Sequence, residues 1–415
     1  MRRIAAFACS IFATSGTRFV ASFGFILAVL LFPASVLGQA QQTKFALKST
    51  VLGEERTILV RTPAAYDSNQ LRYPVLYLTD GDAHLNHTAS SVEFLARNGR
   101  MTEMIVVGIT NTDRTRDLTP TRVRIASNGA SYPTSGGADN FLKFIETELI
   151  PEIEKRYRVQ PYRILAGHSL GGLFAVHAMV SRPEIFHSYI AVSPALQWDD
   201  ELLLKRSTDF FKDHKDWNAT LVVTLGNEQG LIGESFANFK RLLNDTKISG
   251  FEWHAEQLAD EDHGTVVLRS HYLGLRKIFN GWQVPRDPET GGYAVDLKGA
   301  EEHYNRLSKR FNFTISPPEN LINQLGYQAL FSGKDVEAIA IFKSNIERYP
   351  NSANVYDSLA EAYERGDRID LAAPLYEKAQ TIGEQIKDPN LAIYKANFER
   401  ASKKLKQAEA AKKNH

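Results

Sequence analysis

Thiols are almost absent from this sequence. Its 415 residues include a single cysteine, Cys9, and four methionines. A lone cysteine excludes an intramolecular disulfide and a metal site built from several thiolates. Because Cys9 lies in the segment that we expect to be removed, the mature chain also has no cysteine to serve as a nucleophile. The fold must therefore be held together by packing alone.

The sequence also has no excess of charge of either sign. It contains 49 lysine and arginine residues and 48 aspartate and glutamate residues, so the formal net charge is +1. This balance produces no global field that would attract a polyanion, and we expect no nucleic-acid partner. Hydrophobic residues make up 43% of the chain and charged residues 23%, which is typical of a globular protein. The length predicts at least two folded units.

Long apolar runs are scarce, and the one near the N-terminus is short for a membrane span. It covers residues 23–36 and is interrupted by Pro33. Arginines precede it and small residues follow it near position 40, in the order typical of a secretory signal peptide. We expect residues 1–40 to be cleaved and the mature protein to be periplasmic or secreted. The alternative is an N-terminal membrane anchor.

Between residues 41 and 285, short apolar runs alternate with amphipathic ones. Residues 44–51 and 56–61 are expected to form a hairpin. Residues 73–79 are nearly continuously apolar, as in a strand buried on both faces. Residues 139–157 have an apolar side chain at every fourth position, which predicts a helix with one buried stripe. Strands alternating with helices predict an α/β domain with a mostly parallel sheet.

The pattern changes after about residue 285. Residues 286–319 are rich in proline, glycine and charge, which predicts a loosely packed linker. The sequence that follows contains two copies of one pattern, and this pattern resembles the tetratricopeptide repeat. The repeated positions are Leu325, Gly326, Ala338, Phe342 and Pro350 in the first copy, and Leu359, Ala360, Ala372 and Tyr376 in the second. We expect residues 320–415 to form a small all-α repeat domain with a capping helix, which binds a protein partner, self-associates or buttresses the first domain.

A candidate nucleophile lies in the segment Gly167-His168-Ser169-Leu170-Gly171. This segment follows a predicted strand, residues 163–166, and precedes an apolar helical run. The pattern G-x-S-x-G between a strand and a helix is the nucleophile elbow of the α/β-hydrolase fold. It predicts Ser169 as the nucleophile and the amide of Leu170 as a donor to an oxyanion. The alternative is an elbow that has lost its activity.

The base is expected late in the domain, because the chain order in this fold is serine, acid, histidine. His263 follows the candidate last strand, residues 251–258, and precedes an apolar helix. We therefore prefer it to His254, which lies within that strand, and to His271, which lies within the helix.

The acid is less clearly marked. Glu228 directly follows the predicted strand 221–225, where a loop can present a carboxylate to the imidazole. Asp260 and Asp262 are close to the base in sequence and are alternatives. A Ser–His dyad without an acid also remains open.

A second oxyanion donor is expected after the early buried strand. The residues there are Asp80, Gly81 and Asp82, and the amides of Gly81 or Asp82 suit this role. Asp82, His84 and His87 resemble metal ligands, but the set is incomplete. We therefore expect no metal and no cofactor.

Taken together, these motifs resemble the esterase family that includes enterochelin (siderophore) esterases, feruloyl and acetylxylan esterases and S-formylglutathione hydrolase. The resemblance spans roughly residues 44–282. The segments that carry it are residues 73–81, 106–109, 113–120, 167–172, 193–194 and 262–264. It implies an α/β-hydrolase fold and the hydrolysis of small-molecule esters. Segment 113–120, Asp-Arg-Thr-Arg-Asp-Leu-Thr-Pro, is most similar to the siderophore-esterase branch, which cleaves trilactones of catecholate siderophores.

The resemblance suggests residues for substrate binding. Arg114 and Arg116 are expected on a loop near the elbow, where a guanidinium could pair with catecholate oxygens. The alternative is an ion-pair network of these arginines with neighbouring aspartates. His168, beside the nucleophile, and Trp198 are the other candidates, and Trp198 could instead belong to the core.

Two departures from the family pattern keep other functions open. The simplest siderophore esterases lack a repeat domain, and many hydrolases have aspartate where this chain has Glu228. The alternatives are a carbohydrate esterase of the feruloyl or acetylxylan type, and a non-catalytic protein that binds its partner through the repeats.

Overall fold

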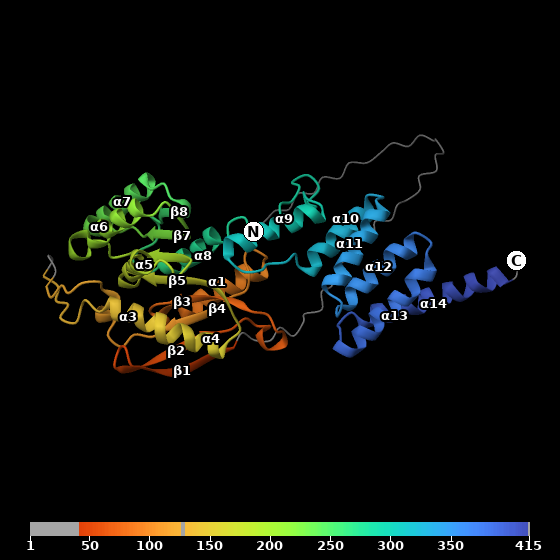
Figure 1. Cartoon of the computed structure of the whole chain (residues 1–415), viewed down its shortest axis with the longest axis horizontal. Helices are drawn as coiled ribbons and strands as arrows, with labels where there is room; N and C mark the ends of the chain where they lie inside the picture. Colours follow the sequence, from red (N-terminus) through yellow and green to blue (C-terminus); the bar gives the residue numbers. More distant parts are fainter. Residues whose placement is uncertain (1–40, 126–128, 414–415) are drawn as a thin grey trace, which may run out of the picture. The chain divides into compact units, whose positions relative to one another are not determined.

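The computed structural model describes residues 41–125 and 129–413, and the part of the chain up to about residue 285 is built on one eight-stranded sheet (Figure 1). The strands are β1 (Gln42–Ser49), β2 (Glu54–Arg61), β3 (Tyr73–Leu78), β4 (Ile105–Ile109), β5 (Val159–His168), β6 (Ser188–Val192), β7 (Asp216–Leu225) and β8 (Ser249–Gln257). Their order is β1-β2-β4-β3-β5-β6-β7-β8. The β1–β2 hairpin is antiparallel, as predicted, and β2 pairs antiparallel with β4. The six strands from β3 to β8 are parallel to one another.

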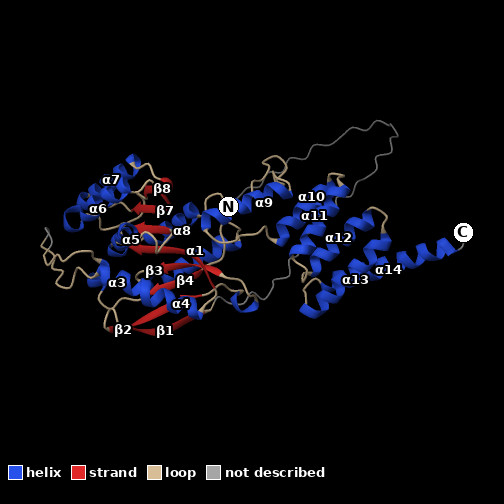
Figure 2. Cartoon of the chain, viewed as in Figure 1, coloured by secondary structure: helices blue, strands red, loops and turns tan. Residues whose placement is uncertain are grey.

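Helices cover both faces of this sheet (Figure 2). The helices of this region are α1 (Gly81–Arg97), α2 (Arg114–Leu118), α3 (Ala138–Phe144), α4 (Ile150–Arg156), α5 (Leu170–Ser181), α6 (Trp198–Asp213), α7 (Gly230–Asp245) and α8 (Val266–Ile278). Buried side chains of α3 to α7 pack on one face, and those of α1 and α8 pack on the other. The predicted α/β-hydrolase architecture is confirmed.

Strand β3 shows why its sequence is continuously apolar. All six of its residues are buried. Val75 and Tyr77 pack in the core on the α5 side, whereas Leu76 and Leu78 pack in the core on the α1 side. A strand with helices on both faces has no solvent-facing side, so the usual alternation of polar and apolar residues is lost.

The helical stripe predicted over residues 139–157 is present, with one irregularity. Its residues Phe141, Ile145, Leu149 and Ile153 are all buried in one core. Helices α3 and α4 are joined by a π-helical turn, Ile145–Leu149. This insertion lets the stripe stay on the sheet although the spacing of four exceeds the helical repeat of about 3.6 residues.

The prediction of a loosely packed linker over residues 286–319 is wrong for the central part of this segment. Helix α9 (Leu297–Phe311) lies there, and the Asp296 carboxylate caps it by accepting a 2.8 Å hydrogen bond from the Gly299 amide. Its Phe311 ring stacks on Phe279 with centroids 5.0 Å apart. The proline and glycine residues that suggested a linker lie on either side of this helix. The prediction relied on them and did not use the apolar positions between them. The buried stripe is Ala300, His303, Tyr304, Leu307 and Phe311.

The rest of the described chain is helical. It contains α10 (Glu319–Phe331), α11 (Asp335–Arg348), α12 (Ala353–Arg365), α13 (Ile369–Ile386) and α14 (Leu391–Lys413). The spacing between the starts of α10 and α12 equals that between the starts of α11 and α13, as a repeat predicts. Gly326 permits the close approach of α10 and α11, because a Cβ there would lie 2.5 Å from the Phe342 ring. Ala338, Ala360 and Ala372 are fully buried in the same way.

None of the helices in residues 41–125 and 129–413 is long and apolar enough to cross a membrane. The expected signal peptide, residues 1–40, and the lone Cys9 lie outside the described residues.

Candidate active site

Ser169 occupies a strained turn between β5 and α5. Its φ is +59° and its ψ is −112°, a conformation that non-glycine residues rarely adopt. Its amide is anchored by a 2.9 Å hydrogen bond to the Val192 carbonyl on β6. The flanking glycines are required by packing, because a Cβ on Gly167 would lie 2.3 Å from the Gly171 carbonyl oxygen. This is the geometry of a nucleophile elbow, which holds the serine at the carboxyl edge of the sheet.

His263 and Glu228 are joined directly. His263 Nδ1 lies 2.7 Å from Glu228 Oε1, so the imidazole donates its Nδ1 proton to the carboxylate. Burial raises the pKa of the Glu228 carboxyl, but interactions that include the hydrogen bonds with His263 and Ser193 together lower it by more than burial raises it. The net pKa is below its ordinary value. The carboxylate therefore stays charged and leaves the Nε2 atom of His263 free to accept a proton.

The alternative bases and acids lie elsewhere or have other partners. His254 is paired with Glu256 at 2.7 Å on β8. Asp260 is paired with Arg269 at 2.5 Å. Asp262 accepts hydrogen bonds from the amides of Gly264 and Thr265 at 2.8 Å, which shapes the loop carrying His263. The geometry thus favours His263 as the base and Glu228 as the acid.

The predicted oxyanion donors lie at the starts of two helices. Leu170 is the first residue of α5, and Gly81 and Asp82 are the first two residues of α1. The first amides of a helix have no intrahelical acceptor, so they are available to an anion. The α1 loop lies tight against its neighbours, because a Cβ on Gly81 would be 2.4 Å from the Gly108 carbonyl carbon.

Arg114 and Arg116 are both held in ion-pair networks. Arg114 Nε lies 2.6 Å from Asp80 Oδ1. Arg116 Nε lies 2.7 Å from Asp117 Oδ1, and its Nη2 is 3.0 Å from both carboxylate oxygens of Glu54. The pair of Arg116 with Asp117 matches the alternative of a network with neighbouring aspartates. Arg114 pairs instead with Asp80, and Glu54 joins the Arg116 network; the sequence did not predict either partner.

Trp198 is packed in the core rather than open to solvent. Its side chain is 7% exposed, and its Nε1 donates a 3.2 Å hydrogen bond to Thr121 Oγ1. The ring of Tyr132 meets it edge-on, with centroids 5.2 Å apart. Trp198 therefore connects the loop that contains Thr121 and Tyr132 to the start of α6.

His168 links the elbow to the base. Its ring centroid is 4.5 Å from that of His263. Burial, and then the neighbouring His263, lower the pKa of His168 to about 4, so the ring is neutral at pH 7. Its Nε2 atom is buried and has no hydrogen-bond partner within the described part of the chain.

Three more histidines extend this contact into the layer between α1 and α8. The ring-centroid distances are 5.7 Å for His84–His168, 5.2 Å for His84–His87 and 5.7 Å for His87–His271. Burial is the main cause that lowers the pKa of His84, His87 and His271. Within the described residues, no group of three or more His, Cys, Asp or Glu side chains is arranged to hold a metal ion. Sequence reasoning noticed His84 and His87, but it could not show that they meet His168 and His271.

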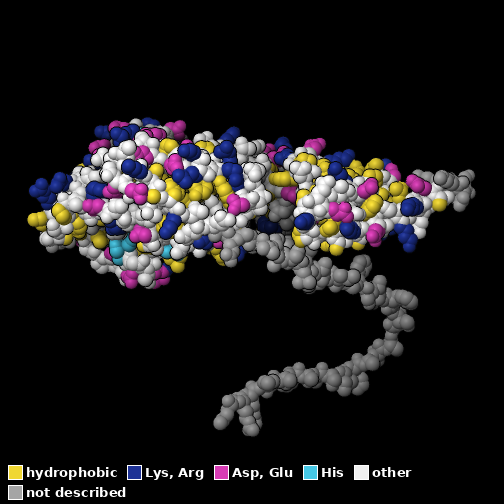
Figure 3. Space-filling view, turned by 90° about the horizontal axis from the view of Figure 1, so that it is seen from below, with side chains coloured by type: hydrophobic (Ala, Val, Ile, Leu, Met, Phe, Trp, Pro, Cys, Tyr) yellow, Lys and Arg dark blue, Asp and Glu magenta, His cyan; other side chains and the backbone are white. Residues whose placement is uncertain are grey.

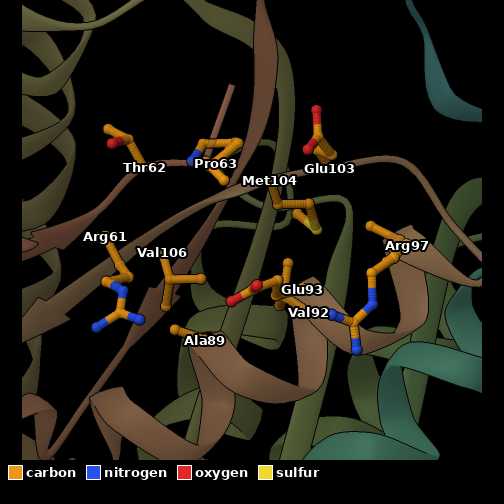
Figure 4. Close-up of a pocket in the computed structure, with 12 residues that line it drawn as sticks. Arg61, Thr62, Pro63, Ala89, Val92, Glu93, Arg97, Glu103, Met104 and Val106 are labelled. Atoms are coloured by element: carbon orange, nitrogen blue, oxygen red, sulfur yellow. The ribbon is translucent and has the colours of Figure 1, made fainter. Parts of the chain in front are cut away.

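A cavity of about 190 Å³ lies at the other end of the sheet (Figure 4). Its lining includes Thr62, which follows β2, and Met104, which precedes β4. Because β4 and β5 run in the same direction, this cavity is at the opposite edge from Ser169. The cavity is therefore separate from the candidate active site.

Comparison with known proteins gives one matching family. A sequence model of the family described as "Putative esterase" matches residues 49–230. The chain is 33% identical over 188 residues to the ferri-bacillibactin esterase BesA of Bacillus subtilis, which covers 42% of this chain and 63% of that protein. It is 33% identical over 193 residues to the siderophore triacetylfusarinine C esterase of Aspergillus fumigatus, which covers 42% of this chain and 64% of that protein. The matched segment thus spans less than two thirds of the length of either relative.

Solved structures extend the similarity beyond that segment. The crystal structure of an IroE-like serine hydrolase from Shewanella oneidensis superposes with a TM-score of 0.65 and 26% identity, covering 74% of this chain and all of that one. An uncharacterised protein from Capnocytophaga ochracea superposes with a TM-score of 0.62, covering 86% of this chain at 18% identity, and shares the fold.

Proposed function

We propose that this protein is a serine esterase that hydrolyses carboxylic esters through an acyl-enzyme on Ser169. The observation that carries the proposal is the 2.7 Å hydrogen bond between His263 and Glu228, with the His263 ring centroid 4.5 Å from that of His168, the residue before the strained elbow serine. An imidazole oriented by a buried carboxylate, next to a serine at a helix start, is the arrangement that acyl transfer requires.

In the first step, Ser169 Oγ attacks the ester carbonyl carbon while its proton passes to His263 Nε2. The carbonyl electron pair moves to the oxygen, and the amides of Leu170 and of the Gly81–Asp82 turn stabilise this oxyanion. The intermediate then collapses, the bond to the alcohol oxygen breaks, and His263 returns the proton to the leaving alcohol. Glu228 remains charged throughout and stabilises the imidazolium that forms transiently.

In the second step, His263 removes a proton from a water molecule that attacks the acyl-enzyme. The second oxyanion collapses, the acid product leaves, and the proton returns to Ser169 Oγ. Apart from this water molecule, the proposed chemistry uses side chains and amides of this chain.

We propose siderophore esters, including trilactones, as the substrate class. The names of both sequence relatives, which describe siderophore esterases, support this choice. The segment around Arg114 and Arg116 supports it as well, since it is most similar to that branch. On the face shown in Figure 3, acidic and basic side chains are interspersed, which suits a small-molecule substrate better than a polyanion.

Two further parts of the proposal concern the ends of the chain. We propose that residues 1–40 direct the protein to the periplasm or the outside of the cell. We also propose that the hairpins α10–α11 and α12–α13 are tetratricopeptide-type repeats that bind a protein partner or mediate self-association. The equal spacing of their helix starts and the small buried residues at the helix crossings support this assignment.

The proposal is tested by assaying the mature protein on p-nitrophenyl acetate and on a catecholate trilactone. We expect Ser169→Ala and His263→Ala to lower kcat by at least about 10³-fold on both substrates. Turnover that survives Ser169→Ala would sink the nucleophile assignment. Turnover of the simple ester alone would retain the esterase and reject the trilactone.

A further inference from the structure

We propose that Arg114 is a positioning residue that sets the separation between the two halves of the oxyanion site. The inference rests on the proposed esterase function and assigns Arg114 a role other than substrate contact. One half of the site is the Leu170 amide, which follows the nucleophile. The other half is the Gly81–Asp82 turn, which opens α1.

The guanidinium of Arg114 holds a residue just ahead of each half. Its Nε donates to Asp80 Oδ1 at 2.6 Å, and its Nη2 is 3.0 Å from Asp80 Oδ2. The same Nη2 donates to the His168 carbonyl oxygen at 2.9 Å. Asp80 directly precedes Gly81, and His168 directly precedes Ser169. One side chain thus fastens together two segments that are far apart in sequence.

Asp80 needs an external hold because of its backbone. Its φ of +55° and ψ of +41° are left-handed, which costs a non-glycine residue about 1 kcal/mol or more. The residue is buried, with its side chain 6% exposed, and its carboxylate also accepts a 2.7 Å hydrogen bond from Asn111 Nδ2. Fixing this carboxylate fixes the direction in which the following amides point.

The segments that carry the two halves pack closely at Gly171, so a small displacement matters. A Cβ placed on Gly171 would lie 2.3 Å from Thr79 Oγ1 and 3.2 Å from Asp80 Oδ2. Oxyanion donors act at about 2.7 to 3.1 Å from the oxygen. A donor displaced by about 0.5 Å loses much of its stabilising effect. The planar fork of arginine suits this task, because it satisfies a carboxylate and a carbonyl in one fixed geometry that an ammonium does not reproduce.

The first test is Arg114→Lys, assayed on p-nitrophenyl acetate. This substrate carries no charge for an arginine to recognise, so a substrate-binding role predicts no change. A positioning role predicts a kcat lower by about 10- to 100-fold with little change in KM. We expect Asp80→Asn to show the same pattern, and the double variant to lose little more than either single one.

Arg163→Lys is the matched control. Arg163 also contacts a carbonyl and a carboxylate, with its Nε 2.7 Å from the Ile185 carbonyl oxygen and its Nη1 3.5 Å from Glu154. It lies on β5, and these partners belong neither to the Asp80 turn nor to the elbow. We expect its kcat to stay within about twofold of the unmodified protein. Melting curves identify any variant that fails to fold.

A second readout is the rate at which a neutral fluorophosphonate labels Ser169, since the tetrahedral adduct forms in the same oxyanion site. We expect labelling of Arg114→Lys to slow in parallel with kcat. Slower turnover of the catecholate trilactone alone, through a raised KM, would overturn the positioning role. If the unmodified protein is labelled but hydrolyses no ester, the proposed function fails, and slower labelling of Arg114→Lys still supports positioning. Absence of both labelling and turnover in the unmodified protein would overturn both.

Discussion

Thr88 on α1 and His271 on α8 are joined by a hydrogen bond inside the protein, with Thr88 Oγ1 2.8 Å from His271 Nδ1. Thr88 Oγ1 also donates to the His84 carbonyl at 2.7 Å, so the hydroxyl proton is used there and His271 Nδ1 is the donor. Helix α1 begins with Gly81 and Asp82 of the proposed oxyanion site, and α8 follows the loop of His263, the proposed base. This bond therefore ties together the elements that carry two parts of the site.

We expect Thr88→Val to lower the free energy of unfolding by about 1 to 3 kcal/mol, because His271 Nδ1 would be buried without a partner. Urea unfolding followed by circular dichroism measures this loss. Thr208→Val is the control, since the hydrogen bond of Thr208 to the Leu204 carbonyl is exposed to solvent. Equal midpoints for the two variants would contradict the prediction.

Glu228→Gln separates a triad from a dyad. The amide keeps the shape of the side chain but loses the charge that stabilises the imidazolium, so we expect kcat on p-nitrophenyl acetate to fall by about 10²- to 10⁴-fold at pH 7. Glu256→Gln removes a carboxylate that is paired with His254 on β8 instead. A loss no greater than that of Glu256→Gln would favour the dyad.

The partly buried His84, His87 and His168 and the buried His271 predict a loss of stability in acid. Burial lowers the folded-state pKa of His84, His87 and His271, and it lowers that of His168 to about 4. The unfolded chain therefore binds more protons below about pH 6.5. The contribution of these neutral histidines to the free energy of unfolding is therefore fully present above about pH 6.5 and decreases as the pH falls from about 6.5 toward 4.

Urea unfolding at several pH values between 7 and 4.5 gives the slope of this dependence. Each additional proton bound by the unfolded chain contributes up to about 1.4 kcal/mol per pH unit. We expect His87→Gln to have a shallower slope than the unmodified protein, because it removes one of the histidines whose pKa burial lowers. A slope unaffected by His87→Gln would show that this histidine is not part of the acid sensitivity.

Gly326→Val tests whether the helical region stands apart from the chemistry. The added side chain would collide with the Phe342 ring, where even a Cβ would be 2.5 Å away. We expect it to destabilise the helical region by about 1 to 3 kcal/mol and to leave kcat on p-nitrophenyl acetate within about twofold. At Gly366 a Cβ would meet nothing closer than 3.6 Å, so Gly366→Ala is the control. If Gly326→Val lowered kcat by much more than about twofold while Gly366→Ala did not, the helical region would be shown to support the active site.

Local sequence determined the elements that depend on neighbours along the chain. The elbow around Ser169 needs two glycines at fixed positions, a strand before it and a helix after it, and all of these lie close together in the sequence. The buried strand β3 and the helical character of the C-terminal region were visible for the same reason. Such patterns report which side chains are buried, and burial is already encoded in hydrophobic spacing.

Tertiary structure alone decided the contacts between distant segments. The bond of His263 to Glu228 depends on β7 and β8 being neighbours in the sheet, and the bond of Arg114 to Asp80 depends on the position of α2 beside the start of α1. Side-chain composition allows several carboxylates to pair with His263 or with Arg114. Only the order of the strands, which is set by packing over the whole domain, selects among them. The same holds for the histidine layer, since its rings come from α1, α8 and the elbow, which only the tertiary structure brings together.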